Sequence, residues 1–270
     1  MTSGFAADLR SGLYGAARGA YALALRGRYA RRGMPWRVHD QTVRIDPDVR
    51  RFVPHESECA LYDFLQSHVR PGSQVLDVGA FLGVYAVLES RLAGPRGRVV
   101  TLEPTAWSAS VARRHIGYNA GQGAPITLIE AAAGEARGQA MLHEYDEPYV
   151  NALGSAVDVT GTPRLRAVDV VTIDDVCSEY GLKPTFIRMD VQGAEWHALK
   201  GARETIRAAG TDLVIVAEMH PQCWPGFGVD ARTALDTIRS LGLRAEPLEP
   251  GAELFARDGH VIFTPGGIPV

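Results

Sequence analysis

The sequence contains only three cysteines among 270 residues, which limits the kinds of cross-link that could hold the fold together. Cys59, Cys177 and Cys223 lie far apart and form no C-x-x-C pair. A disulfide framework needs an even set of cysteines, and a zinc knot needs closely spaced ones. We therefore expect neither, and a reducing compartment fits this cysteine content best.

Long hydrophobic runs are also missing. No apolar run approaches the roughly 20 residues that a membrane-spanning helix needs. The first residues lack the charged and then apolar pattern of a secretory signal. We therefore expect no membrane span and a cytoplasmic location.

Lysine is almost absent, because Lys183 and Lys200 are the only two and nearly all other basic residues are arginines. The formal net charge is -3 and the isoelectric point is near 6.2. A protein that wraps DNA or RNA phosphates normally carries an excess of positive charge. We therefore expect no nucleic-acid partner.

The first 37 residues are rich in Arg, Gly and Ala. Tyr14, Tyr21, Leu25 and Tyr29 recur there at helical spacing. We predict a helical extension over residues 1–55 that packs beside the functional site, with its arginines in solvent. Contact of this basic face with a membrane surface or an acidic partner is the less favoured alternative.

From about residue 56, short β-branched runs alternate with longer helical stretches. This pattern predicts one α/β domain over residues 56–270, with a parallel sheet covered by helices. We predict strands at 74–78, 98–102, 126–129, 185–189 and 212–217, and helices at 84–92, 108–119, 194–208 and 231–241. We also predict extended segments at 139–143, 156–159 and 167–171, and two final strands at 243–246 and 260–263, the last antiparallel.

A glycine-rich turn follows the first predicted strand, where residues 75–83 read V-L-D-V-G-A-F-L-G. Gly79 and Gly83 therefore lie at a strand's carboxyl end, where open α/β sheets bind ligands. Because position 81 is Phe, the G-x-G-x-x-G fingerprint of dinucleotide binding is not present. Asp77 suits a ligand that carries an ammonium group, such as S-adenosylmethionine, better than one that carries phosphates.

The second predicted strand ends in the pair Glu103-Pro104. An acid at this position can accept hydrogen bonds from both hydroxyls of a ribose. NAD-dependent enzymes share this arrangement. Glu103 therefore indicates an adenosine-containing cofactor without choosing between the two.

Three further polar residues follow later strands. Asp190 ends one strand, and Glu218 and His220 share a side of the next because strand side chains alternate. If the strands are neighbours, the three converge, and the imidazole could take a proton from a hydroxyl. They could instead hold Mg²⁺ or another divalent metal, which we do not favour. Glu195, in the first turn of the next helix, is assigned a structural role.

Taken together, these motifs resemble the FkbM family of class I methyltransferases, from about Glu58 to Glu246. The residues that carry the resemblance are D-V-G-A-x-x-G at 77–83, Glu103-Pro104, Asn119, Gly138, Val171-Thr172-Ile173-Asp174-Asp175, D-V-Q-G-A-E at 190–195, and Glu218 with His220. The resemblance implies a Rossmann-like, mostly parallel seven-stranded sheet with helices on both faces. It also implies S-adenosylmethionine as the donor and an alcohol or sugar hydroxyl as the acceptor.

Carried over to this sequence, the resemblance places Asp77, Gly79 and Gly83 near the methionine part and Glu103 at the ribose. Glu130, Ala131 and Ala132 fall near the adenine, and Phe81 and Pro104 lie in the same cofactor-binding turns. Asp190 would contact the cofactor's amino group or the reacting hydroxyl. The sequence departs from the family at two positions, with Phe81 where Asn is usual and Gln192 where Glu is usual.

We therefore predict an S-adenosylmethionine-dependent O-methyltransferase that acts on a natural product or a sugar. His220, with Glu218 or Asp190, is the predicted proton acceptor. Two alternatives stay open: a module of the same fold that binds the adenosyl group without catalysis, and an NAD-dependent dehydrogenase. The acceptor, which segments 144–155 and 222–229 would help to select, is not identified from the sequence, and a homodimer is left open.

Overall fold

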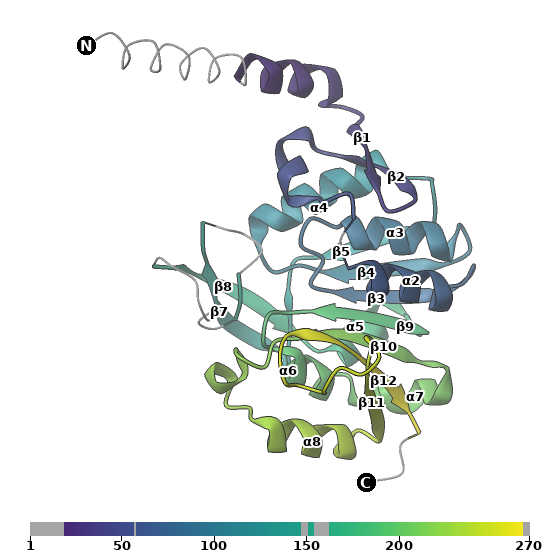
Figure 1. Cartoon of the computed structure of the whole chain (residues 1–270), viewed down its shortest axis with the longest axis vertical. Helices are drawn as coiled ribbons and strands as arrows, with labels where there is room; N and C mark the ends of the chain where they lie inside the picture. The colour runs from purple at the N-terminus through teal and green to yellow at the C-terminus, as the bar shows by residue number, and fades with distance from the viewer. Residues whose placement is uncertain (1–18, 57, 147–150, 154–161, 267–270) are drawn as a thin grey trace.

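The computed structural model describes residues 19–56, 58–146, 151–153 and 162–266. Within these residues, the centre is a seven-stranded sheet in the order β11-β12-β10-β9-β3-β4-β5 (Figure 1). Its strands are β3 (Gln74–Val78), β4 (Arg98–Leu102), β5 (Ile126–Ile129), β9 (Phe186–Asp190), β10 (Val214–Met219), β11 (Leu243–Pro247) and β12 (Gly259–Pro265). The predicted α/β fold is confirmed, and each predicted strand of this sheet lies within two residues of its expected bounds.

Most of the sheet is parallel. β3 pairs in parallel with β4 and β9, and the outer neighbours β5 and β10 continue the same direction. β12 is antiparallel to both β10 and β11, as predicted for the last strand. The register aligns Val78 with Leu102 on one side and with Met189 on the other. The turns that leave these strands therefore meet at one edge of the sheet.

Helices cover both faces of the sheet, and strand residues alternate between them. Val75 packs in the cluster that includes α2 (Cys59–His68) and α3 (Val84–Ala93). The adjacent Leu76 packs in the cluster that includes α5 (Ile173–Tyr180) and α8 (Ala231–Ser240). α4 (Ala106–Tyr118) contacts α3 and β5. The period of two along each strand thus builds the two halves of the core.

The helix predicted over 194–208 is in fact two helices, α6 (Glu195–Lys200) and α7 (Arg203–Ala209). They are separated at Gly201, where a Cβ would lie 2.1 Å from the carbonyl oxygen of Gly134. The Asp174 carboxylate then accepts hydrogen bonds from the first backbone N–H groups of α7 at 3.0 and 2.7 Å. Close approach of another backbone segment, together with a new N-terminal cap, explains the break.

A small second sheet lies beside the carboxyl edge of the large one. It contains β6 (Ala132–Ala133), β7 (Gly138–Glu144) and β8 (Arg164–Val171) in the order β6-β8-β7. The extended segments predicted at 139–143 and 167–171 are confirmed as parts of β7 and β8. The segment predicted at 156–159 lies outside the described residues.

The N-terminal extension is only partly helical. Residues 19–29 form a helix that extends away from the body in Figure 1, and residues 1–18 lie outside the described residues. From Met34 on, the prediction of a helical extension over residues 1–55 is wrong, because β1 (Met34–Val38) and β2 (Gln41–Ile45) form an antiparallel hairpin. Met34, Val38, Val43 and Ile45 are buried against α3 and α4, so a short alternation of apolar residues decides the structure here.

A 3₁₀ helix, η1 (Pro47–Phe52), connects the hairpin to the main domain. Asn119, which follows α4, joins this extension to the domain by two hydrogen bonds to the backbone of Arg44, at 3.0 and 2.8 Å. The extension therefore packs directly on the main domain.

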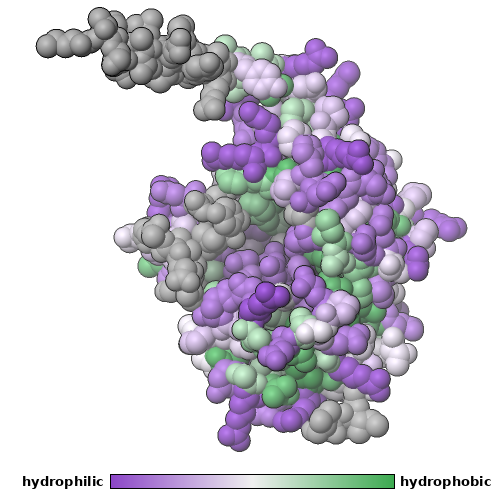
Figure 2. Space-filling view, in the orientation of Figure 1, coloured by the Kyte–Doolittle hydropathy of each residue, from purple (hydrophilic) through white to green (hydrophobic). Residues whose placement is uncertain are grey.

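No helix among the described residues is long and apolar enough to cross a membrane. On the face drawn in Figure 2, hydrophobic residues are interspersed with hydrophilic ones.

Glu89 is an unusual feature of the core. It is fully buried in α3, and neither carboxylate oxygen accepts a hydrogen bond from any described residue. Burial, reinforced by the charge of Asp77, raises the pKa of Glu89 well above its ordinary value. Folding therefore favours the protonated form of this carboxyl group.

We expect Glu89→Met to raise the free energy of unfolding at pH 8 by about 1 to 3 kcal/mol, the usual cost of an unsatisfied buried polar group. Above pH 4.5 the unfolded carboxyl loses its proton while the folded one keeps it, so stability of the native sequence falls as pH rises. The gain should accordingly be larger at pH 8 than at pH 5. Urea unfolding at both pH values measures it, and equal gains would contradict this account of Glu89.

Candidate functional site

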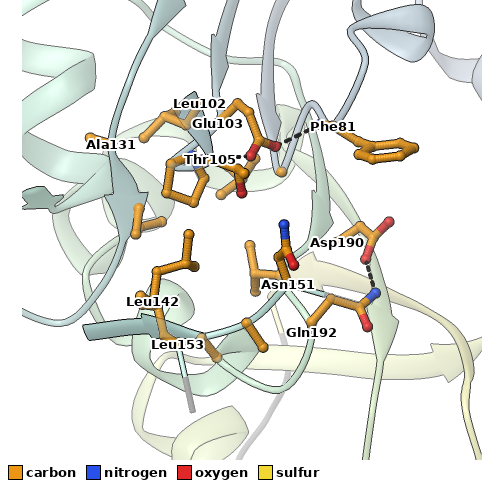
Figure 3. Close-up of a pocket in the computed structure, with 18 residues that line it drawn as sticks. Phe81, Leu102, Glu103, Thr105, Ala131, Leu142, Asn151, Leu153, Asp190 and Gln192 are labelled. Carbon is orange, nitrogen blue, oxygen red and sulfur yellow. Dashed lines mark hydrogen bonds between the residues drawn. The ribbon is translucent and has the colours of Figure 1, made fainter. Parts of the chain in front are cut away.

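A cleft opens at the carboxyl ends of β3, β4 and β9, where the small sheet meets the large one (Figure 3). The turns at the edge of the large sheet supply Glu103, Thr105, Asp190 and Gln192, and the segment 151–153 supplies Asn151. The small sheet supplies an apolar wall. The residues that line it are Val78, Gly79, Phe81, Leu102, Glu103, Pro104, Thr105, Ala131, Ala132, Ala133, Leu142, Asn151, Ala152, Leu153, Asp190, Val191, Gln192 and Ala194.

The turn after β3 depends on Gly79. Its φ is +92°, and a Cβ there would lie 1.8 Å from the carbonyl oxygen of Asp190. The N–H groups of Gly79 and Ala80 both donate to the carbonyl oxygen of Leu102 at 2.9 Å. Absence of a side chain at position 79 therefore allows the turns after β3, β4 and β9 to come together.

Glu103 lies at the end of β4 and is 5% exposed. Its two oxygens accept hydrogen bonds from the backbone N–H groups of Phe81 and Thr105, each at 2.8 Å. Burial raises the pKa of Glu103 to about 7, although these two hydrogen bonds favour the ionised form. The carboxylate faces the cleft and still has lone pairs for a ligand.

Phe81 occupies the left-handed backbone region, with φ of 48°. Asn tolerates this region better than a bulky aromatic residue does. The Phe81 backbone still reaches Glu103, and its ring points away from that carboxylate (Figure 3). The departure from the family pattern at this position therefore preserves the turn.

Several residues assigned to the cofactor from the sequence lie elsewhere. Asp77 is fully buried and accepts hydrogen bonds from Thr101 Oγ1 at 2.8 Å and from Arg188 at 3.0 Å. Gly83 packs on α4, where its Cβ would lie 3.0 Å from that of Ala112. Glu130 pairs with Arg113.

None of these three is among the described residues that line the cleft, whereas Gly79, Phe81, Glu103, Pro104, Ala131, Ala132 and Asp190 are. A strand end or a turn identified in the sequence thus predicts the location of a residue better than the direction of its side chain.

Arg188 is the partner that sequence analysis missed. Its side chain is 6% exposed and contacts Asp77 at 3.0 Å and Asp190 at 3.2 Å. Burial opposes its charge, but the surrounding carboxylates raise the pKa of Arg188 well above its ordinary value. Arg188 precedes Asp190 by two positions in β9, and side chains two positions apart in a strand lie on the same side. This spacing in the sequence could have predicted the contact.

His220 is held by a second buried acid. Its Nδ1 lies 2.8 Å from Oε1 of Glu195. The same oxygen accepts a hydrogen bond from Gly193 N–H, and Oε2 of Glu195 accepts one from the Trp224 indole N–H. Burial opposes a charged imidazole, but the hydrogen bond to Glu195 and nearby carboxylates raise the pKa of His220 to about 9. The structural role predicted for Glu195 therefore includes orientation of His220.

The three predicted catalytic residues do lie together. His220 Nε2 is 3.9 Å from Glu218 Oε1, and Gln192 Nε2 lies 3.0 Å from Asp190 and 3.1 Å from His220. Burial and the charge of Asp190 raise the pKa of Glu218 to about 7. Asp190 lines the cleft, whereas Glu218 and His220 lie behind it within the described part of the chain.

Two overlapping sets of side chains have metal-ligating atoms within 4.8 Å of one another, namely Asp190, Glu218 and His220, and Glu58, Glu218 and His260. A carboxylate on the other nitrogen of His220 is an arrangement that metal-bound histidines often have. However, the buried guanidinium of Arg188 already pairs with Asp190, and its positive charge opposes a second cation. A metal remains the less favoured interpretation.

We expect Gly79→Ala to abolish ligand binding in the cleft and to lower the unfolding temperature. The added Cβ collides with the backbone of β9, and the backbone at φ of +92° becomes strained. Gly72→Ala is a matched control, because Gly72 has φ of +96° and open space where its Cβ would lie. Thermal unfolding of both variants separates collision from backbone strain, and equal losses would contradict the proposed role of Gly79.

Comparison with known proteins gives a family. A protein-family model described as the methyltransferase FkbM domain matches residues 77–244, which is more than half of the chain. No curated protein matches the sequence significantly.

Three similar solved structures all have TM-scores below 0.5 and low sequence identity. A methyltransferase FkbM from Methylobacillus flagellatus has a TM-score of 0.47 and 19% identity over 72% of this chain, and the match spans only 44% of that protein. A putative rRNA methylase from Clostridium thermocellum has a TM-score of 0.47 and 11% identity, and the match covers 78% of this chain and 97% of that protein. A SAM-dependent O-methyltransferase from Thermotoga maritima has a TM-score of 0.45 and 12% identity, and the match covers 84% of this chain and 68% of that protein. The family match therefore carries the assignment: this chain belongs to the FkbM family of methyltransferases.

Proposed function

We propose that the chain is an S-adenosylmethionine-dependent O-methyltransferase that acts on a hydroxyl of a small molecule. The observation that carries this proposal is the buried Glu103 carboxylate in the cleft, next to the turn of Gly79. An acid at this place can accept hydrogen bonds from two ribose hydroxyls. The family match supports methyl transfer, and it gives no support to the dehydrogenase alternative.

The lining of the cleft fits an adenosyl sulfonium. Glu103 would hold the ribose, and Pro104, Ala131 and Ala132 offer small apolar surfaces to an adenine ring. Gly79 and Phe81 would lie beside the methionine part. When bound, S-adenosylmethionine supplies a methyl group that oxygen nucleophiles attack.

Proton removal is proposed for the group of Asp190, Glu218 and His220. Asp190 lines the cleft and would accept the hydrogen bond of the acceptor hydroxyl. Glu218, with a pKa of about 7, and His220 behind it would then share the proton. The sulfonium of bound S-adenosylmethionine would lie near Asp190. Its positive charge would favour release of the proton from His220, because positive charges lower the pKa of an imidazole.

Cofactor binding should depend on pH through Glu103. With a pKa of about 7, the carboxyl is ionised above that pH and accepts both hydroxyl hydrogen bonds. We expect the affinity for S-adenosylhomocysteine, measured by calorimetry, to fall by up to about tenfold per pH unit below pH 7. Glu103→Gln should bind weakly at every pH.

Glu130→Gln is the control for this experiment, because Glu130 pairs with Arg113 outside the cleft. Its affinity should match that of the native sequence throughout. An unchanged affinity in Glu103→Gln would contradict the assignment of the ribose site.

His220→Ala should lower kcat by about 10² to 10⁴, the usual contribution of general acid–base catalysis, while the Kd of S-adenosylhomocysteine changes less than about threefold. Glu195→Gln keeps the imidazole but removes the carboxylate that raises its pKa. The pH profile of kcat should therefore move to lower pH in Glu195→Gln. Near-normal kcat in His220→Ala would remove His220 from the mechanism.

Methyl release from labelled S-adenosylmethionine in the presence of mixed small-molecule hydroxyl compounds tests the function as a whole. Transfer to oxygen supports the proposal. Tight binding of S-adenosylhomocysteine without transfer to any acceptor favours the alternative of a binding module. Transfer to RNA would instead contradict both the small-molecule acceptor and the expectation of no nucleic-acid partner.

A further inference from the structure

A second cavity lies beside the cofactor cleft, between the N-terminal extension and α3. Its volume is about 260 Å³. Phe81 and Asp190 line both the cavity and the cleft, so the two spaces adjoin at these residues. The residues that line the cavity are Val38, Phe52, Val53, Pro54, Glu58, Ala80, Phe81, Leu82, Val84, Tyr85, Leu88, Arg188 and Asp190.

Most of the wall is apolar and comes from two sources. Val38, Phe52 and Val53 belong to the extension, which lies outside the region matched by the family model. Val84 and Leu88 belong to the first turns of α3. A wall of this kind offers no hydrogen bonds, so it favours apolar ligand surface and penalises polar groups left without partners.

The polar groups of the cavity form one continuous chain of contacts. Glu58 Oε2 accepts a hydrogen bond from the Tyr85 hydroxyl at 2.8 Å. The Arg188 guanidinium carbon lies 4.4 Å from the centre of the Tyr85 ring, and its Nη2 lies 3.2 Å from Asp190. Because Asp190 also lines the cofactor cleft, this polar end is the end that adjoins the cleft.

Arg188 has a hydrogen-bond donor to spare. The residue is 5% exposed, and its buried Nε–H donates to no described residue. A buried donor without an acceptor costs free energy. An oxygen atom brought into the polar end of the cavity would meet a guanidinium that is already fixed in place by Asp77 and Asp190.

We propose that this cavity binds the methyl acceptor, and that the acceptor is a compact, mainly apolar molecule of one or two rings with its hydroxyl at one end. This rests on the proposed function. The apolar wall would take the rings, and the polar end would hold the hydroxyl at the junction with the cleft. A free sugar fits poorly, because its hydroxyls point in all directions and most would face Val, Leu and Phe side chains.

The chemical step balances at this junction. The acceptor oxygen forms a bond to the methyl carbon as the carbon–sulfur bond of the donor breaks, and the sulfur keeps that electron pair. The hydroxyl proton passes to Asp190. While the proton leaves and before the bond to the methyl carbon is complete, the oxygen carries partial negative charge, which Arg188 stabilises because a fixed cation in a buried site acts strongly on such charge.

The test uses the full chain saturated with S-adenosylhomocysteine and two probes, 2-naphthol and methyl β-D-glucoside, with binding measured by calorimetry. We expect 2-naphthol to bind and the glucoside not to bind. Val84→Phe, which fills the cavity, should weaken 2-naphthol binding at least tenfold while the Kd of S-adenosylhomocysteine stays within about twofold. Val214→Phe is the matched control, because Val214 is also half-buried but begins β10, at the amino ends of the parallel strands and away from the cleft.

The outcomes separate this inference from the function on which it rests. Stronger binding of the glucoside than of 2-naphthol, no binding of 2-naphthol, or equal binding of 2-naphthol by Val84→Phe and Val214→Phe would overturn the inference. Each of these results would leave cofactor binding intact. Failure of the native chain to bind S-adenosylhomocysteine at all would instead overturn the proposed function, and the acceptor cavity with it.

Discussion

The functional edge of the molecule depends on one buried ion pair network, in which Arg188 bridges Asp77 and Asp190. Removal of one member of such a network costs about 3 to 5 kcal/mol, because it leaves an uncompensated charge in the interior. The network joins β3 to β9 behind the two turns that form the cleft. It also fixes the orientation of Asp190, which both the cleft and the neighbouring cavity share.

The buried acids near the cleft divide into those that hold the fold and those that are free to bind a ligand. Asp77 is fully buried and accepts hydrogen bonds from Arg188 and Thr101, so its carboxylate joins neighbouring strands and is not available to a ligand. Glu103, which the backbone N–H groups of Phe81 and Thr105 hold in place, faces the cleft with lone pairs for a ligand. Glu195 orients His220. Acids with similar sequence contexts thus take different roles according to the donors that surround them.

The sequence predicts the main sheet well, because long alternation of β-branched strands and helices is a strong pattern. It predicts less well where tertiary contact decides the structure. The hairpin of β1 and β2 depends on burial against α3 and α4, and the break at Gly201 depends on the approach of Gly134. Both contacts join segments that are far apart in the chain, so local patterns contain little information about them.

Candidate site residues follow the same rule. The sequence locates the strand ends that carry Glu103 and Asp190, since turn glycines and acids mark them. It does not show that Asp77 and Glu130 turn toward arginines, or that Glu195 reaches His220. Side-chain partners depend on residues more than 15 positions away in each of these cases.

We propose that the cleft beside Glu103 binds an adenosyl group. A crystal structure of the chain soaked with S-adenosylhomocysteine measures this directly. We expect both ribose hydroxyls within hydrogen-bonding distance of the Glu103 carboxylate, and the sulfur directed toward Asp190. Density for the compound at any other location, or an empty cleft at saturating concentration, would contradict it.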